Sequence, residues 1–282
     1  MNVPLTKRDV FMANPLVDEA LKIIEHLSKK GVIIRAAGAV SVYLHLTNET
    51  RKLWNIIGRR LTDMDFAAYT TQRQEIEKAL QHELGYDIWR PALTPTLTQN
   101  RIIFYKPSEN RNLRLHEMDT KGDVFLDELC MNHTIKWIGR LEVDYPTIPL
   151  AELFLEKTQI VGGPRRLGMG EKDAIDLLCL LLDHEVGSND KDTINAEVIA
   201  GRLSKDWGFY YTVSCNIKKL VDFWLPKYKL SEQNKEIILA RLNKLQRIIE
   251  NKPKSLQWKM RSKIGTKSKW YQDVEEVERS LQ

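Results

Sequence analysis

Two aspartates separated by one residue, Asp63 and Asp65 in the segment LTDMDFAAY, are the side chains of this sequence best suited to hold a divalent cation. On a β-strand, alternate side chains lie on one face, so both carboxylates project together while Met64 points the other way. Two adjacent like charges raise one pKa, so the pair favours Mg²⁺ (or Mn²⁺), which takes carboxylate oxygens together with substrate phosphates. Such pairs also occur in turns and caps, which is the alternative interpretation.

A third acid that would complete the site is expected in the segment GDVFLDEL. Asp123 and Asp127 are predicted to lie on one face of the same strand. Asp123, at the start of that strand, is the better candidate to meet the first pair, whereas solvent or a cap would satisfy Asp127. The prediction is a catalytic metal site formed by Asp63, Asp65 and Asp123.

Groups that could hold phosphate lie close to the acidic pair in sequence. Gly38 and Ala39 end a predicted strand and begin a predicted helix, where backbone N–H groups can bind an anion. Ser41 could supply a hydroxyl one turn later. Arg59 and Arg60 precede the aspartates, and they could bind phosphate or pair with the aspartates instead.

Hydrophobic periodicity predicts the elements that must position these residues. Helices are predicted from 15 to 30, from residue 39 or 40, over 72–84 and 149–160, and through most of 171–249; strands are predicted over 32–37, 61–69, 86–89, 101–105, 113–117, 123–129 and 135–143. The fold class is therefore α+β, a mixed β-sheet flanked by helices and followed by a helical C-terminal domain. A Gly-rich interruption at 162–170 places the boundary between residues 1–161 and 162–282.

Composition limits the class of protein. The chain has 282 residues, of which 43% are hydrophobic and 29% charged, as in ordinary globular proteins. The strongly apolar stretch at 177–182 is much shorter than the roughly 20 residues of a membrane-spanning helix, and the N-terminus lacks the features of a secretory signal. Three widely spaced cysteines predict neither a disulfide framework nor a Cys-x-x-Cys metal site, so a reducing cytoplasm is expected.

Positive charge gathers towards the C-terminus. Residues 218–269 contain 15 Lys or Arg against 4 Asp or Glu, although the formal net charge of the whole chain is +5. Such a segment favours a polyanionic partner, because basic side chains near phosphates release counterions; a solvated helical face is the alternative. The candidate nucleic-acid-binding residues are Lys254, Lys259, Arg261 and Lys263, with Trp258 and Trp270 either stacking on bases or anchoring this segment to the body.

Two further patterns have structural and functional interpretations. Residues 192–220 can form two short helices with a turn at 205–208, which indicates either a helix-turn-helix that contacts nucleic acid or an ordinary packed helix pair. Cys130 and His133 are three residues apart, but no second Cys or His lies at ligand spacing, so a structural histidine is expected.

Taken together, these motifs resemble the nucleotidyltransferase fold of the DNA polymerase β superfamily. The segments RAAGAVSVYLH, RRLTDMDFAAY, DVFLDELCMNHTI and PTIPLAELFLEKTQIV look like prokaryotic proteins related to abortive-infection nucleotidyltransferase toxins. The resemblance implies that Gly38 and Ala39 form the phosphate turn, that Asp63 and Asp65 are metal ligands and that Asp123 is the third carboxylate. Catalytic relatives usually have Ser or Gly where this sequence has Ala39.

The resemblance extends to the segment LEKTQIV and to the pair Lys172-Asp173. Lys157 is the candidate here. It could neutralise a triphosphate as a point charge, or it could be an exposed helix lysine.

The function expected from this sequence is transfer of a nucleoside monophosphate from a nucleoside triphosphate to an RNA or protein hydroxyl, with Mg²⁺ (or Mn²⁺) and with release of pyrophosphate. The resemblance also implies a toxin or defence role and a partner chain of a toxin–antitoxin pair. A different expectation, which Ala39 motivates, is a regulatory protein that binds nucleotide or nucleic acid through this fold with weak or no turnover.

Overall fold

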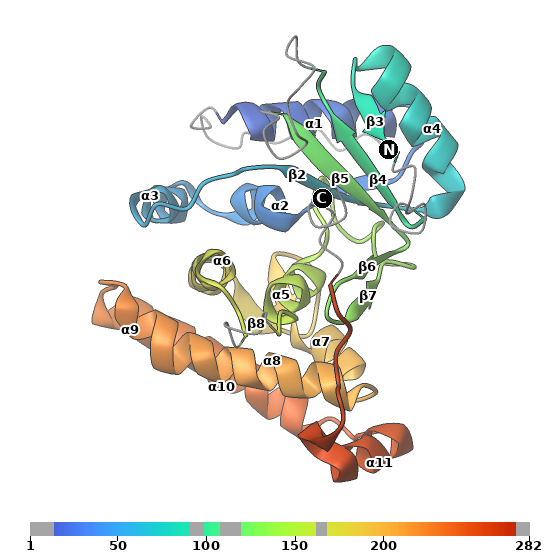
Figure 1. The fold of residues 1–282 in the computed structure, drawn as a ribbon. Coiled ribbons are helices and arrows are strands. Elements are labelled where there is room, and N and C mark those ends of the chain that lie inside the picture. The colour runs from blue at the N-terminus through green and yellow to red at the C-terminus, as the bar shows by residue number, and fades with distance from the viewer. Residues whose placement is uncertain (1–13, 91–98, 108–119, 162–167, 275–282) are drawn as a thin grey trace.

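A computed structural model of the chain describes residues 14–90, 99–107, 120–161 and 168–274 (Figure 1). The strand expected over 113–117 lies outside these residues, and so does the start of the expected C-terminal domain at residue 162. The division into two domains therefore stays a prediction. Among the described helices, none is both long and apolar enough to cross a membrane.

The first half of the chain alternates helices with strands. Its elements are α1 (Pro15–Ser28), β1 (Ile34–Ala37), α2 (Gly38–His45), α3 (Asn48–Ile56), β2 (Met64–Ala68), η1 (Thr70–Gln72), α4 (Arg73–Lys78), η2 (Ala79–Glu83), β3 (Asp87–Trp89), β4 (Arg101–Tyr105), β5 (Lys121–Leu126), β6 (Glu128–Cys130) and β7 (Thr134–Lys136). Local signals explain several ends: Asn14 Oδ1 accepts the Leu16 N–H at the start of α1, with Pro15 in the first turn.

The second half is mainly helical. Its elements are α5 (Leu150–Thr158), α6 (Glu171–Asp183), β8 (Glu185–Gly187), β9 (Thr193–Asn195), α7 (Ala196–Leu203), α8 (Trp207–Lys219), η5 (Leu220–Trp224), α9 (Leu225–Lys227), α10 (Glu232–Asn251), α11 (Leu256–Ile264) and η6 (Gly265–Lys267). The two helices expected within 192–220 are confirmed as α7 and α8, whose N-caps are the side chains of Asn195 and Asp206.

A five-stranded mixed sheet has the order β1-β2-β5-β4-β3, with one parallel pair, β2 and β5, among antiparallel neighbours. One face is buried at its centre, where it contains the side chains of Phe66, Val124 and Phe104. Residues that pair across strands share a face, so Asp65, Asp123 and Ile103 lie in one row on the other face. The α+β fold class is confirmed: a mixed sheet flanked by helices, followed by a helical region.

The strand expected over 135–143 is wrong beyond β7. Gly139 has a φ of +68°, and the Arg140 N–H donates to the Trp137 carbonyl over 2.8 Å, so the chain turns there. The prediction for 123–129 is also corrected, because β5 ends before Asp127 and β6 follows it. Helix α3 was not expected from the sequence, although the Thr47 hydroxyl caps it by accepting the Thr50 N–H.

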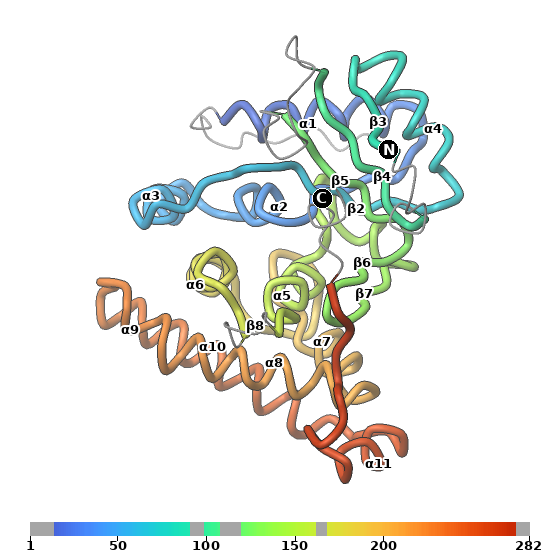
Figure 2. Tube along the Cα trace, in the orientation of Figure 1, coloured from blue at the N-terminus to red at the C-terminus, as the bar shows by residue number. Residues whose placement is uncertain are grey.

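The helical region packs below the sheet in Figure 1, with α5 and α6 nearest to it and α8 and α10 further away. Helix α5 contacts α2 on one side and α6, α7 and α8 on the other. After α11 the chain runs back towards β6 and β7 (Figure 2), where the Gln272 N–H donates to the Asn132 carbonyl over 3.0 Å. The C-terminal segment thus lies along the body of the molecule.

Candidate active site

Two of the predicted carboxylates, Asp65 and Asp123, lie side by side at the junction of β1, β2 and β5. Asp65 and Asp123 are direct register partners on the two parallel strands, and Ala37 pairs with Asp65 from the other side. Asp63 immediately precedes β2. All three aspartates are partly buried. The sheet therefore brings together acids that are 58 positions apart in the sequence.

The Gly38 turn lies directly against this pair of strands. Gly38 has a φ of +60°, and a Cβ added to it would lie 2.2 Å from Asp65 Oδ2. Only glycine fits there without strain or displacement of the carboxylate. The junction of strand and helix expected at this point is confirmed, with α2 beginning at Gly38 itself. The Gly38 N–H donates to Glu156 Oε2 over 3.3 Å, so a carboxylate of the chain itself already binds this turn.

The crowding of acids changes their protonation. Burial raises the pKa of Asp65 well above its usual range, and the charges of Asp63, Asp123 and Glu156 raise it further, while Lys157 opposes them. Burial also raises the pKa of Asp123, against the lowering effect of Arg101. Burial and repulsion thus favour the neutral form of these carboxyl groups, and a bound divalent cation would favour the ionised form instead.

Arg101, the first residue of β4, is a site residue that sequence reasoning missed. Its Nε and Nη2 atoms donate to Asp123 Oδ1 and Oδ2 over 2.8 and 2.7 Å, a bidentate ion pair. Its guanidinium also lies 5.1 Å from the centre of the Phe125 ring. The strand 101–105 was predicted, but its pairing with β5 was not, so the sequence contained no signal for this contact.

Lys157 is not an exposed helix lysine. It is 6% exposed, and its Nζ lies 3.3 Å from Glu156 Oε1, 3.4 Å from Asp176 Oδ2 and 3.9 Å from Asp173 Oδ1. Burial lowers the pKa of this ammonium, but the three acids more than compensate and raise it. Lys157 is therefore charged and held beside the carboxylate site.

The two arginines before β2 have different environments. Arg59 is buried and pairs with Asp176 through two hydrogen bonds of 3.0 Å, rather than with the nearby aspartates. Trp54 Nε1 donates to the same carboxylate over 3.0 Å. Arg60 is exposed. Asp176, another residue that the sequence did not single out, thus connects α6 to the segment that leads into β2.

The remaining nucleotide-binding candidates lie on α2. Ala39 is 8% exposed and Ser41 is fully buried. The Ser41 hydroxyl has no hydrogen-bond partner among the residues that the structure describes. A phosphate would reach this hydroxyl only if the surrounding side chains moved, so Ser41 stays an untested candidate.

Asp127 lies outside β5, which corrects the prediction that it shares a strand with Asp123. It has a φ of +63° and lies in the turn between β5 and β6. Its Oδ1 accepts the Thr70 N–H over 3.0 Å, so the carboxylate forms a cap. This agrees with the expectation that a cap or solvent satisfies Asp127.

The donor types at the site suit a hard cation, because carboxylate oxygens are the ligands that Mg²⁺ and Mn²⁺ accept. Asp65 and Asp123 are adjacent, and burial, together with the charges of neighbouring acids, raises the pKa of Asp65. Within the described parts of the chain, no three acidic, His or Cys side chains converge as they stand to hold a metal. Both oxygens of Asp123 instead accept hydrogen bonds from Arg101.

His133 has a structural environment. It is 4% exposed, its Nε2 lies 2.8 Å from Thr212 Oγ1, and its ring stacks on Phe209 with centroids 4.7 Å apart. Burial lowers its pKa to about 4. The expectation of a structural histidine is confirmed, and Cys130, nearby in sequence, is exposed.

The four basic candidates near the C-terminus divide into two groups. Lys254 lies over the Tyr210 ring at 5.3 Å, and Arg261 donates to the Gly265 and Ser268 carbonyls over 2.7 and 2.8 Å. Lys259 and Lys263 are exposed on α11. Two of the four therefore hold the C-terminal region together, and two face solvent.

Both C-terminal tryptophans contact the body. Trp258 meets the Tyr210 ring edge-on at 5.2 Å, while Trp270 meets Tyr211 in the same way and donates from Nε1 to Thr212 Oγ1 over 3.1 Å. The anchoring alternative is thus the one that these contacts favour.

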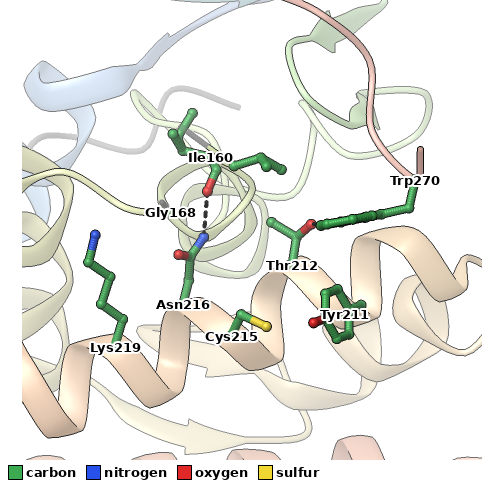
Figure 3. A pocket seen from close by; sticks show the side chains of 9 residues that line it. Ile160, Gly168, Tyr211, Thr212, Cys215, Asn216, Lys219 and Trp270 are labelled. Atoms are coloured by element: carbon green, nitrogen blue, oxygen red, sulfur yellow. Dashed lines mark hydrogen bonds between the residues drawn. The ribbon is translucent and has the colours of Figure 1, made fainter. Parts of the chain in front are cut away.

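A cavity of about 300 Å³ lies beside Trp270, just after the C-terminal end of α5 (Figure 3). Its lining is mainly apolar and consists of Ile160, Val161, Gly168, Tyr211, Thr212, Cys215, Asn216, Lys219 and Trp270. Asn216 Nδ2 donates to the Ile160 carbonyl over 2.7 Å. None of the residues predicted to bind metal or phosphate lines this cavity.

Two crystal structures from Helicobacter pylori are similar to this chain. The structure of JHP933 matches with a TM-score of 0.37 and 14% identity over 89% of this chain and 97% of that one. A protein named as a "putative nucleotidyltransferase" matches with the same TM-score and identity over 83% and 93%. No protein-family model and no curated protein sequence matches the chain. At this distance, the two likenesses assign no activity to the chain.

Proposed function

We propose that the protein is a metal-dependent nucleotidyltransferase that moves a nucleoside monophosphate from a nucleoside triphosphate to a hydroxyl acceptor. The observation that supports it most is the pairing of Asp65 with Asp123 on adjacent parallel strands, with the side-chain-free Gly38 turn against the Asp65 carboxylate. Asp63, Asp65 and Asp123 would hold Mg²⁺ or Mn²⁺, which would supply positive charge to the phosphate oxygens.

Three groups of the chain would bind the substrate, move its proton or position another side chain: the Gly38 backbone, the Asp123 carboxylate and the Lys157 ammonium. The backbone at Gly38 would face the triphosphate, once Glu156 gives up the N–H that it now accepts. Asp123, whose pKa burial raises, would accept the proton of the attacking hydroxyl. The new bond joins the acceptor oxygen to the α-phosphorus, and pyrophosphate leaves. Lys157, whose charge its acidic neighbours stabilise, would orient Glu156 beside the turn.

RNA or a protein hydroxyl is the acceptor within this proposal. The exposed Lys259 and Lys263, on a segment rich in positive charge, support a polyanion such as RNA. A toxin or defence role with a partner chain stays an implication of the sequence resemblance.

A second candidate function is a binding module with weak turnover. Hydrogen bonds within the site favour this function. Glu156 accepts the Gly38 N–H, and Arg101 donates to both oxygens of Asp123. Ala39 in place of a hydroxyl-bearing or glycine residue points the same way. The two candidates differ in whether these contacts yield to a nucleotide.

Incubation with each nucleoside triphosphate labelled on its α-phosphate, Mg²⁺ or Mn²⁺, total RNA and cell lysate tests the proposal. Transfer of label to RNA or protein, lost in Asp123→Asn, is the expected result. Asp127→Asn is the matched control, since its amide oxygen can still accept the Thr70 N–H. Nucleotide binding without transfer in the unmodified protein would favour the binding module, and neither binding nor transfer would reject both.

A further inference from the structure

We propose that Arg101 is an exchange residue: it neutralises Asp123 while the site lacks metal, and it moves to the triphosphate when metal and nucleotide bind. This inference rests on the proposed function and assigns a residue to it that the sequence motifs do not contain. Arg101 would then bind phosphate directly in the loaded site.

The ion pair itself shows that Arg101 and a metal compete for Asp123. Nε and Nη2 of Arg101 occupy Oδ1 and Oδ2 of the carboxylate at 2.8 and 2.7 Å. A bidentate guanidinium uses one lone pair of each oxygen, and its positive charge repels a cation that approaches the remaining ones. Arg101 also feels the charges of Asp65 and Asp63. The guanidinium therefore neutralises part of the charge that a divalent cation would meet.

The position of Arg101 lets it leave. It is the first residue of β4, and its side chain is 27% exposed while that of Asp123 is 16% exposed. The guanidinium lies over the Phe125 ring, 5.1 Å from its centre. A long, partly exposed side chain can rotate away without moving the strand. By contrast, Lys157 is held by Glu156, Asp176 and Asp173 on α5 and α6.

Phosphate is the ligand that the Arg101 guanidinium, once released from Asp123, is best suited to bind. A guanidinium presents planar paired N–H donors that match the oxygens of a phosphate as well as those of a carboxylate. Metal binding at Asp123 would leave this fork free to donate to phosphate oxygens. Arg101 would thus couple the two ligands: metal displaces it, and the nucleotide captures it.

This coupling predicts effects of opposite sign in one variant. In Arg101→Gln, Mn²⁺ alone should bind about tenfold more tightly, because Asp123 has lost its competing cation. Nucleoside triphosphate should bind the Mn²⁺-loaded variant about tenfold more weakly, because the fork is missing. Electron paramagnetic resonance of free Mn²⁺ measures the first constant, and calorimetric titration with a non-hydrolysable triphosphate measures the second.

Two further variants separate this role from a structural one. Arg101→Lys keeps the charge but not the fork, so Mn²⁺ affinity should stay within about twofold while triphosphate affinity still falls. Arg90→Gln removes an exposed arginine that pairs with Glu77 outside the site, and it should change neither constant. If Arg101→Gln does not fold, the Lys variant alone decides.

The outcomes are distinct. Unchanged or weaker Mn²⁺ binding in Arg101→Gln, with normal Mn²⁺ binding in the unmodified protein, would overturn the exchange role and leave the proposed function standing. A triphosphate affinity in Arg101→Lys equal to that of the unmodified protein would also overturn the exchange role and leave the proposed function standing. Absence of Mn²⁺ binding in the unmodified protein, with and without nucleotide, would reject the proposed function and the inference together.

Discussion

The carboxylate site and helix α11 both bring several charged side chains into one small region, but the fold uses those charges differently. At the site, Asp123 and Arg101 meet in a bidentate pair, and Asp65 lies beside them under the Gly38 turn. On α11, Lys259 and Lys263 face solvent. Charges that the sheet holds in pairs can position or exchange ligands, whereas charges on an exposed helix act through their field.

The apolar residues of α11 make the contrast sharper. Leu256, Met260 and Ile264 recur every fourth residue and are 73%, 53% and 49% exposed. No residue of this helix is buried. Yet α11 is attached to the body, because the Arg261 guanidinium lies 4.9 Å from the centre of the Trp207 ring. Proximity in sequence therefore does not indicate which charge supports the fold and which is available to a partner.

The largest expected effect tests the paired charges beside the carboxylate site. Arg59→Met leaves the fully buried Asp176 carboxylate without its main partner and should lower the free energy of unfolding by about 3–5 kcal/mol. Lys218→Met removes one partner of an exposed pair and should leave the free energy of unfolding almost unchanged. Urea unfolding measures both, and equal losses would contradict the distinction.

The second effect concerns the dependence of folding stability on pH that arises from the buried side chain of His133. Burial lowers the pKa of His133 from 6.5 to about 4, so the unfolded chain binds the extra proton first as pH falls. The contribution of neutral His133 to the free energy of unfolding should be fully present above pH 6.5. It should fall by up to about 3 kcal/mol between pH 6.5 and 4.

His133→Gln should flatten this part of the stability profile, while His82→Gln, at an exposed position, should leave its slope unchanged. Unfolding curves recorded across this pH range make the comparison. A slope in His133→Gln equal to that of the unmodified protein would show that other groups cause the loss.

The third effect isolates the contact between the Gly38 turn and Asp65. Gly38→Ala adds left-handed backbone strain and a clash with the carboxylate, and should cost about 1–3 kcal/mol of stability. Gly139→Ala has the same backbone strain, at φ +68°, but meets nothing within 4 Å. The difference between the two unfolding free energies measures the clash. No difference would mean that the carboxylate moves aside freely.

The smallest effect on stability is expected on α11. Replacing Lys259 and Lys263 by Ala should change the unfolding free energy by less than about 0.5 kcal/mol. If RNA binds here, the slope of log affinity against log salt should fall by about 0.7 for each lost phosphate contact on a single strand. Arg261→Ala should instead reduce stability, because its guanidinium holds the Gly265 and Ser268 carbonyls. Filter binding across a salt series distinguishes the two behaviours.

The sequence by itself determined the features that depend on neighbouring residues. The Asn14 cap and Pro15 begin α1, β4 has the predicted bounds, and the strand before Gly38 gives way to a helix. Caps, turns and apolar periodicity act over three or four positions, so they can be read along the chain. The candidate acids Asp63 and Asp65 follow from the same short-range pattern.

Only the tertiary structure decided which partners these residues have. Arg101 reaches Asp123 across 22 positions, and Arg59 reaches Asp176 across 117. Asp127 lies just beyond the strand of Asp123, in a left-handed backbone conformation, and its carboxylate accepts the Thr70 N–H. Strand register and helix packing set these contacts, and both depend on burying one whole apolar face against distant elements. No local pattern encodes the choice of partner, because that choice is made by the sheet and the helices together.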